Sequence, residues 1–227
     1  MLNIKPGIYL VDKPSGPSSH AIVNYFRKLS GIKRVGHCGT LDPLASGLLI
    51  ILVGREYTKQ QSLYLKKDKE YLVTAKLGIT TDTYDQTGKT IKKTNWSKLK
   101  EINKTDLLKI LPEFRGKNQQ TVPIFSAVKI QGQKLYQKAR REEQVELPSR
   151  EIEIKKLLLK NFKKDVKNKM ITCELLVACS SGTYIRSLVH DLGNKLKVGA
   201  HVTALRRTKI DKFHVKNSLS INWDNQL

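Results

Sequence analysis

The pattern of apolar and polar residues predicts a chain in which strands outnumber helices. Residues 48–53 form a continuous apolar run, which indicates a strand buried on both faces. Other short segments are rich in β-branched residues or alternate between apolar and polar positions. They predict strands at 8–11, 71–77, 126–130, 152–159, 170–178 and 202–210.

Helical spacing is clear in two segments. In the first, Ser18 or Ser19 is the expected N-cap and Gly31 the expected C-terminal cap. The second begins after residues 182–183. The two apolar stripes consist of Ile22, Val23, Phe26 and Leu29, and of Ile185, Leu188, Val189, Leu192 and Leu196. Apolar positions between 97 and 116 predict a further, helical insertion.

Strands mixed with unequally spaced helices predict an α+β fold with a mixed, mostly antiparallel central sheet and flanking helices. A length of 227 residues is compatible with one domain or two small ones, and we expect a single catalytic domain over residues 1–227.

Charge narrows the class of partner. The chain carries 42 Lys and Arg against 20 Asp and Glu, a net charge of +22. The lysines are densest in residues 155–169, and a smaller cluster comprises Lys89, Lys92 and Lys93. Such a field attracts phosphates, which favours a nucleic-acid partner, although charge alone does not separate RNA from DNA or anionic lipid.

The sequence gives no sign of a membrane segment or of a metal site. Apolar runs stay below the roughly 18 residues that a membrane span needs, and the first residues lack a signal-peptide core. We therefore expect a cytoplasmic protein with no membrane partner. Cys38, Cys173 and Cys179 form no Cys-x-x-Cys pair, so we expect reduced thiols and no zinc site.

The segment GHCGTLDPLASGLL, residues 36–49, is the main candidate for chemistry. It contains one carboxylate, Asp42, which is followed by Pro43 and lies just before the buried strand. Glycines and a proline restrict the backbone on both sides, so the carboxylate is expected to be held in place. The alternative is an ordinary Asp-Pro turn flanked by glycines.

This segment resembles the catalytic motif of the TruB family, the bacterial tRNA pseudouridine-55 synthases. Other stretches resemble the remaining motifs of the family in the expected order, so that the resemblance extends from residue 8 to about residue 210. These stretches are 11–14 with Gly16, Ser18 and Ser19; 69–71; 125–129 with Gly132, Leu135 and Tyr136; 181–188; and 199–207.

The chain departs from the family pattern in three places. Cys38 stands where threonine or serine is usual, and residues 121–123 replace a segment that commonly carries two prolines. Many relatives carry a C-terminal RNA-binding domain of the PUA or a related type, and because this chain stops at Leu227 we expect that domain to be absent.

The resemblance implies the pseudouridine synthase fold and the conversion of uridine 55 in the T loop of tRNA to pseudouridine, without a cofactor. This reaction needs a carboxylate that attacks C1′ or C6, or that assists a glycal route, and Asp42 matches that position. Arg186 matches the arginine expected to lower the pKa of the carboxyl group and orient it. From composition alone, Arg186 could equally form a structural ion pair.

Three further residues are implied at the uracil. Tyr71 matches the tyrosine that stacks on the target base and is the favoured partner for removing the C5 proton. Tyr184 is expected to pack on the uracil or near Asp42 and Arg186, and Leu205 to line the uracil pocket. Without the motifs, each would read as an ordinary core residue.

Three more residues are implied in RNA binding. His37, expected in a loop, matches the histidine that stacks among RNA bases once the target uridine is extruded; hydrogen bonding within its own loop is the alternative. Lys13 is expected to order the active-site loop or to contact phosphate. Asp85 resembles a position that contacts the tRNA loop.

We therefore expect a monomer that acts on the T arm of tRNA and requires no protein partner. Two other classes remain: a protein that only binds and refolds tRNA, and the catalytic subunit of a guide-RNA-directed particle. A phosphate-loop enzyme or a serine hydrolase is disfavoured, since neither Gly-x-x-x-x-Gly-Lys nor Gly-x-Ser-x-Gly occurs in the sequence.

Overall fold

The computed structural model describes residues 4–141, 143, 145–221 and 223. The chain divides into two compact units. Unit 1 comprises Met1–Leu72 and Ala204–Leu227, and unit 2 comprises Val73–Thr203. Strands and helices are interspersed in both, which confirms the predicted α+β class.

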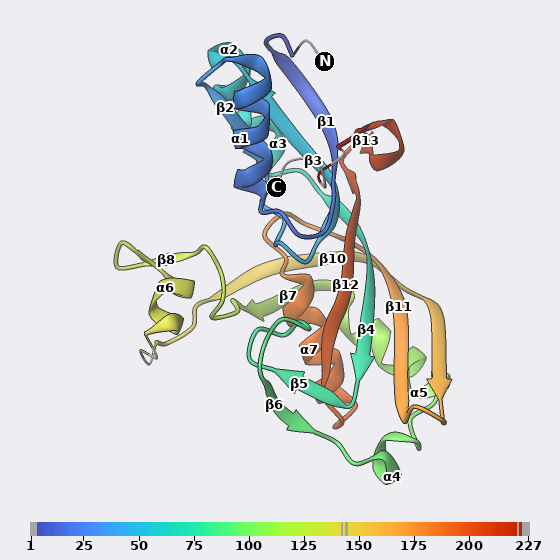
Figure 1. The fold of residues 1–227 in the computed structure, drawn as a ribbon. Helices are drawn as coiled ribbons and strands as arrows, with labels where there is room; N and C mark the ends of the chain where they lie inside the picture. Colours follow the sequence, from blue (N-terminus) through green and yellow to red (C-terminus); the bar gives the residue numbers. More distant parts are fainter. Residues whose placement is uncertain (1–3, 142, 144, 222, 224–227) are drawn as a thin grey trace. The chain divides into compact units, whose positions relative to one another are not determined.

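Unit 1 contains a sheet with the strand order β14-β1-β3-β12 (Figure 1). β1 and β3 are antiparallel, with Gly7 opposite Val53 and Lys13 opposite Gly47, whereas β14 pairs in parallel with β1 and β12 in parallel with β3. β2 pairs with β3, and β13 pairs with β12. The bounds are β1 Gly7–Lys13, β2 Val35–Cys38, β3 Ser46–Val53, β12 Ala200–Ile210, β13 Phe213–His214 and β14 Leu219–Ser220, with a 3-10 turn, η2, at Val215–Asn217.

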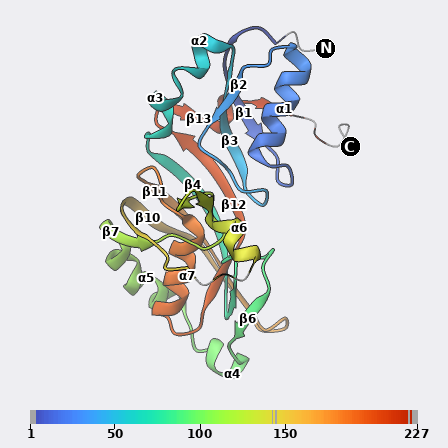
Figure 2. The same cartoon turned by 90° about the vertical axis from the view of Figure 1, so that its left-hand side faces the viewer.

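Helices α1 (Ser19–Ser30), α2 (Arg55–Thr58) and α3 (Gln61–Leu65) pack on β2 and β3 of unit 1 (Figure 2). The caps of α1 confirm the prediction, because the Ser18 hydroxyl accepts a hydrogen bond from the amide of Ala21 and Gly31 is left-handed at φ +70°. The buried face of α1 joins the apolar side chains of β1 and β3 in one core cluster.

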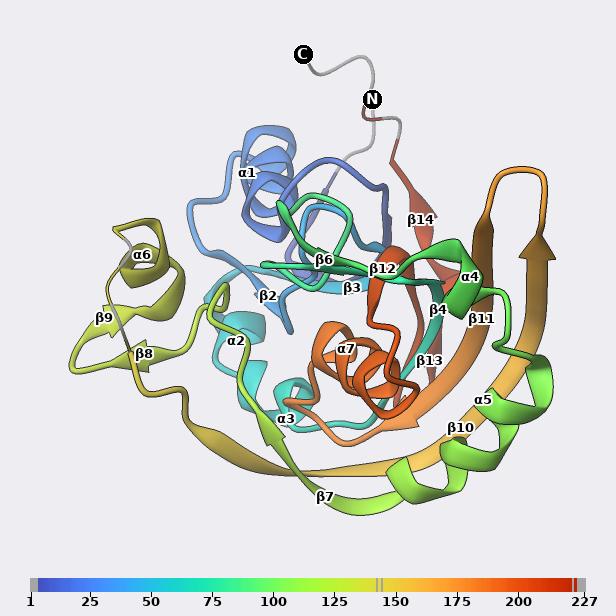
Figure 3. The same cartoon turned by 90° about the horizontal axis from the view of Figure 1, so that it is seen from below.

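In unit 2, antiparallel strands follow the order β4-β11-β10-β7, and β10 and β11 form a long hairpin (Figure 3). This hairpin carries the lysine-rich residues 155–169. The strands are β4 Lys69–Leu77, which begins in unit 1, β5 Ile79–Thr81, β6 Thr90–Lys93, β7 Gly116–Thr121, β8 Lys129–Ile130, β9 Gln133–Lys134, β10 Ser149–Asp165 and β11 Met170–Cys179. The observed pairings are mostly antiparallel, as expected.

The helices of unit 2 are α4 (Trp96–Leu99), α5 (Lys104–Ile110), α6 (Leu135–Arg140) and α7 (Ile185–Lys195), with a 3-10 turn, η1, at Leu111–Phe114. The predicted insertion at 97–116 is therefore broken in two, because Asn103 starts a new helix with a capping box. Four residues of the predicted second stripe, Ile185, Leu188, Val189 and Leu192, are buried along α7, whereas Leu196 lies just beyond the last helical residue and is only partly buried. Tyr184 rather than residues 182–183 precedes that helix.

Two local predictions are wrong. Residues 126–130 were expected to be a strand, but only Lys129 and Ile130 pair, in the short hairpin of β8 and β9. His37 was expected in a loop and lies in strand β2, paired with Ile51 of β3. Both predictions were made from residue types, and residue types alone do not determine which backbone groups form hydrogen bonds with another strand.

Gly47 is tightly constrained both by its backbone angles and by its surroundings. Its φ is +103°, and a Cβ there would collide with the carbonyl oxygen of Arg207. Gly16, at φ +112°, has open space around the same position. Both glycines belong to unit 1.

We predict that Gly47→Ala lowers the free energy of unfolding by more than about 3 kcal/mol, because backbone strain of about 1–2 kcal/mol is added to a collision with main chain. Gly16→Ala is the matched control, because it should be destabilised by the backbone strain alone, without a collision. Urea unfolding of the two variants measures the difference. Equal destabilisation would show that the close approach of β3 and β12 at Gly47 is not needed.

Candidate active site and RNA interface

The loop that carries Asp42 is anchored at several points in unit 1. The hydroxyl of Ser19 accepts a hydrogen bond from the amide of Leu41 at 2.8 Å and donates one to its carbonyl at 2.9 Å. The carbonyl of Asp42 accepts from Ala45 at 3.0 Å, and that of Pro43 accepts from Gly16 at 2.8 Å. Asp42 is partly exposed, and these hydrogen bonds hold the backbone of its loop in place.

Two cations of the same unit lie in the interior near this loop. Lys13 is 0% exposed, and its ammonium group donates to the carbonyls of Pro14 and Pro17 at 2.7 and 2.8 Å. Arg207 is 1% exposed and donates to the carbonyls of Leu48 and Gly39 at 2.7 and 2.9 Å. Lys13 is therefore held by the residues that follow β1, and both roles expected for it, ordering of the active-site loop and contact with phosphate, stay predictions.

The charges of these residues are coupled. Burial lowers the pKa of Lys13 to about 8; the negative charge of Asp42 opposes this shift, and the positive charge of Arg207 adds to it. The ammonium group of Lys13 therefore lies close enough to the Asp42 carboxylate for their charges to interact within unit 1.

His37 lies on β2 and is held through its backbone, since its carbonyl accepts a hydrogen bond from Gln61 at 2.7 Å. Burial lowers the pKa of the imidazole, and the charges of Arg207 and His20 act in the same direction. Nδ1 has no hydrogen-bond partner among the described residues. The side chain is therefore a neutral ring near pH 7, which suits stacking on a base.

A basic pocket of about 500 Å³ adjoins Gly36, directly before His37. Its cationic lining comprises Arg27, Lys33, Arg34, Arg55 and Lys59, from α1, α2 and the segments next to them. Guanidinium and ammonium groups gathered in this way are typical of contacts with a phosphate backbone. These five cations were not predicted to form a site, because they are spread over 33 positions of the sequence and make no local cluster.

Tyr71 and Leu205 are both buried, at 8% exposure, on the parts of β4 and β12 that belong to unit 1. Arg207 follows Leu205 by two residues and therefore lies on the same face of β12. This spacing is the sequence signal that could have identified Arg207 as an inward-facing cation.

Arg186 and Asp85 meet within unit 2. Arg186 is 6% exposed; it donates to the carbonyls of Thr83 and Phe125 at 2.7 and 3.0 Å, and Nη1 lies 3.6 Å from Oδ2 of Asp85. Asp85 also accepts hydrogen bonds from Thr83 and Thr87. Asp85 is 5% exposed and pairs with the guanidinium of Arg186; its expected contact with RNA stays a prediction.

Tyr184 precedes α7 in the same unit. Its amide donates to the side chain of Gln120 at 2.8 Å, and its carbonyl accepts from the same amide group at 3.0 Å. The guanidinium of Arg150 lies 5.3 Å from the centre of the Tyr184 ring, within cation–π range. The backbone of Tyr184 is therefore fixed while its ring is half-buried.

The candidate residues thus fall into two groups: Lys13, His37, Asp42, Tyr71 and Leu205 belong to unit 1, and Asp85, Tyr184 and Arg186 to unit 2. In the described ranges, no group of three or more His, Cys, Asp or Glu residues has the geometry of a metal site. Cys38, Cys173 and Cys179 are buried and form no disulfide. Across the same ranges, no helix has the length and apolar character to cross a membrane.

Comparison with known proteins defines the class. Over 97% of its length the chain superposes on Cbf5 in the crystal structure of a Cbf5-Nop10-Gar1 complex, with a TM-score of 0.71 and 25% identity, while it covers 56% of that chain. Together with the family matches of the sequence, this superposition identifies the pseudouridine synthase fold.

Residues 27–185 match the TruB family pseudouridylate synthase (N terminal domain), and residues 186–225 match the tRNA pseudouridylate synthase B C-terminal domain. The chain belongs to the TruB family of pseudouridylate synthases. It is 42% identical to tRNA pseudouridine synthase B of Prochlorococcus marinus, over 97% of this chain and 68% of that protein. It is 37% identical to the protein of the same name from Chlamydia pneumoniae, over 97% of this chain and 89% of that one.

Proposed function

We propose that the protein is a tRNA pseudouridine synthase that isomerises uridine 55 in the T loop. The observation that carries the proposal is Asp42, a carboxylate on an anchored loop inside the family motif, close enough to the buried ammonium group of Lys13 for their charges to interact. Curated relatives with 37–42% identity carry the name tRNA pseudouridine synthase B, which supports tRNA as the substrate.

The reaction breaks the bond from N1 to C1′ and forms one from C5 to C1′; C5 loses a proton and N1 gains one. In our proposal Asp42 is the nucleophile, at C1′ or C6, or the base of a glycal route. Tyr71 stacks on the uracil and removes the C5 proton, and Tyr184 and Leu205 bound the uracil. Each role is supported by the match of that residue to a family motif.

Arg186 is proposed to orient Asp42 and to hold it ionised. Its bonds to two carbonyls and to Asp85 support the role, because they fix the guanidinium plane before RNA arrives. Asp85 is then a positioning residue.

Two features of unit 1 are proposed to take part in RNA recognition. His37 is proposed to fill the gap left by the extruded uridine, as a neutral ring, while the basic pocket beside Gly36 holds phosphates. We propose that the protein works in the cytoplasm as a monomer without a protein partner.

The second candidate function is that of a catalytic subunit in a guide-RNA-directed particle. The likeness to Cbf5 in a complex with Nop10 and Gar1 is the observation in its favour. The higher identity to the tRNA pseudouridine synthases B favours the first function.

We predict that the purified protein alone forms pseudouridine at position 55 when added to unmodified tRNA, and that an isolated T-arm hairpin is also a substrate. Mapping of pseudouridine at single-nucleotide resolution measures both. Activity that appears only after a guide RNA or another protein is added would contradict the proposal. A hairpin that is ignored while tRNA is modified would show that recognition extends beyond the T arm.

A further inference from the structure

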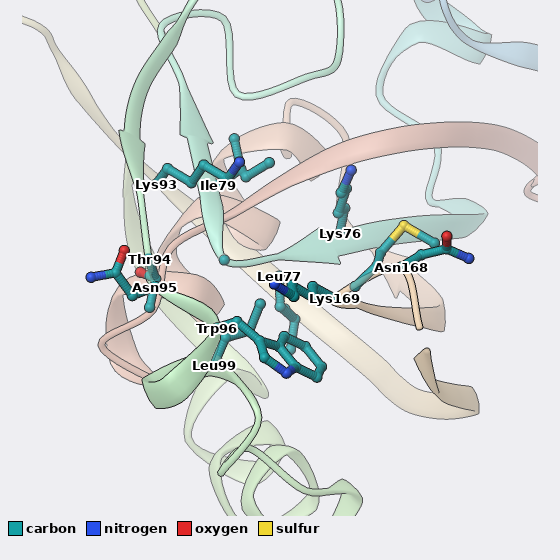
Figure 4. A pocket seen from close by; sticks show the side chains of 12 residues that line it. Lys76, Leu77, Ile79, Lys93, Thr94, Asn95, Trp96, Leu99, Asn168 and Lys169 are labelled. Atoms are coloured by element: carbon teal, nitrogen blue, oxygen red, sulfur yellow. The ribbon is translucent and has the colours of Figure 1, made fainter. Parts of the chain in front are cut away.

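A second hollow lies in unit 2 and has no part in the proposed chemistry. We call it the Trp96 pocket; it has a volume of about 410 Å³. Three segments form it: the end of β4 with the turn into β5, the end of β6 with α4, and the turn between β10 and β11. Figure 4 shows the side chains that these segments contribute, among them one lysine from each segment: Lys76, Lys93 and Lys169.

The frame of the pocket is rigid. Gly78, at φ +91°, leaves no room for a Cβ because Leu99 packs against its backbone. The amide of Gly78 donates to Gly199 and its carbonyl accepts from Thr94, both at 2.8 Å. Lys164 on β10 donates to the carbonyl of Lys100 at 2.6 Å, which ties the hairpin to the end of α4. Binding here therefore requires little ordering of the backbone.

The chemistry of the lining is selective. Lys76, Lys93 and Lys169 supply three ammonium groups, Trp96 supplies an indole, and none of the described lining residues is acidic. The carboxylate of Asp165, three residues before Asn168, accepts hydrogen bonds from the backbone and side chain of Asn168. Ammonium groups and an indole in one lining match a ligand that carries both a phosphate and a planar base.

The surroundings extend this charge. The exposed strand β6 carries Lys92 and Lys93, and the hairpin on the other side carries the lysine-rich residues 155–169. A polyanion that crosses the pocket meets lysines on both sides, whereas a free mononucleotide would use only those inside it. This continuity favours a strand of nucleic acid as the occupant.

We infer that the Trp96 pocket is an auxiliary site for single-stranded RNA, in which one unpaired base stacks on Trp96 and the adjacent phosphates contact Lys93 and Lys169. The choice of RNA over other polyanions rests on the proposed function. The site adds affinity for the tRNA substrate and takes no part in the chemical step.

The chain contains two tryptophans, so Trp223→Phe leaves Trp96 as the only indole and keeps a ring against Tyr25. In this background, hexauridylate should quench the Trp96 fluorescence, because a stacked base does so, and inorganic phosphate should not. Should Trp223→Phe fail to fold, the quenching of Trp96 can be obtained as the difference between the quenching of the parent chain and that of Trp96→Leu.

Removing the contacts should weaken binding by predictable amounts. Trp96→Leu should lower the affinity for hexauridylate by about 5-fold to 100-fold, the usual value of one stacked base. Lys93→Gln with Lys169→Gln should reduce the slope of log affinity against log salt by about 1.4, from two lost phosphate contacts. Lys104→Gln with Lys109→Gln, which are exposed on α5 and outside the pocket, lose the same charge and should change the slope less.

The outcomes separate this inference from the proposed function. Quenching that depends on Lys93 and Lys169 supports the pocket even if no pseudouridine is formed. An active enzyme whose Trp96→Leu variant binds hexauridylate and tRNA as tightly as the parent overturns the inference and leaves the proposed function intact. Quenching by vesicles of phosphatidylglycerol, with none by hexauridylate, overturns it in favour of a lipid surface.

Discussion

Replacement of Asp42 by Asn is expected to abolish pseudouridine formation while tRNA still binds. The amide is nearly the same size as the carboxyl group, and the backbone of the loop is held by Ser19, Ala45 and Gly16, so the site should keep its shape. The lost group is the nucleophile or base of the reaction, which a neutral amide does not replace. Pseudouridine formed in single-turnover reactions measures the effect.

Binding and folding serve as controls for this variant. One negative charge removed from a chain of net charge +22 should leave tRNA affinity unchanged or slightly higher. Asp82→Asn, in unit 2, removes the same charge from a partly exposed carboxylate outside the proposed site. Turnover of Asp42→Asn within about tenfold of the parent, a barrier change of about 1.4 kcal/mol, would end the nucleophile assignment.

The second large effect is expected for Arg186→Lys. The guanidinium reaches the carbonyls of Thr83 and Phe125 with separate nitrogens and also pairs with Asp85. A lysine ammonium is a single point that cannot hold this planar arrangement. We expect a loss in turnover of about a hundredfold or more, comparable to the removal of one preorganised donor from an active site.

A structural role would give a different result. Arg115→Lys is the matched control, because Arg115 belongs to the same unit and donates to the carbonyl of Leu157. It should lose little activity. If Arg186→Lys has normal turnover with a lowered melting temperature, Arg186 is structural and another cation serves Asp42, with Lys13 and Arg207 the first to test.

Periodicity in the sequence located most of the elements that burial decides. The run at 48–53 and the stripe of α1 were placed correctly, because their side chains are almost wholly enclosed and the pattern records that enclosure. It failed for residues 126–130, where only two residues pair in a short local hairpin, and for β2, whose backbone pairs with β3. The pattern of apolar residues likewise did not predict that the helical segment 97–116 is interrupted at Asn103.

The candidate site shows the same division. Motifs selected Asp42, Tyr71 and Arg186, but they did not reveal that Asp85 is buried against Arg186 or that Arg207 lies in the interior. Charged residues are normally assigned to the surface. A buried cation is recognised only when its carbonyl partners are seen, and for Arg207 these lie about 160 residues away.

Unit 1 is assembled from both ends of the chain, and this affects its synthesis on the ribosome. β3 is made early and is almost entirely apolar, yet it pairs with residues 206 and 207 of β12, and β1 pairs with residues 219 and 220 of β14. At about 5–20 residues per second, the interval between these segments lasts roughly ten to thirty seconds. During that time β1 has no partner strand on the edge that later pairs with β14, and residues 46 and 47 of β3 lack their partners on β12, whereas unit 2 is continuous in sequence and can fold first. The nascent chain is consequently most prone to aggregation, and most in need of chaperone cover, before residues 206–220 emerge.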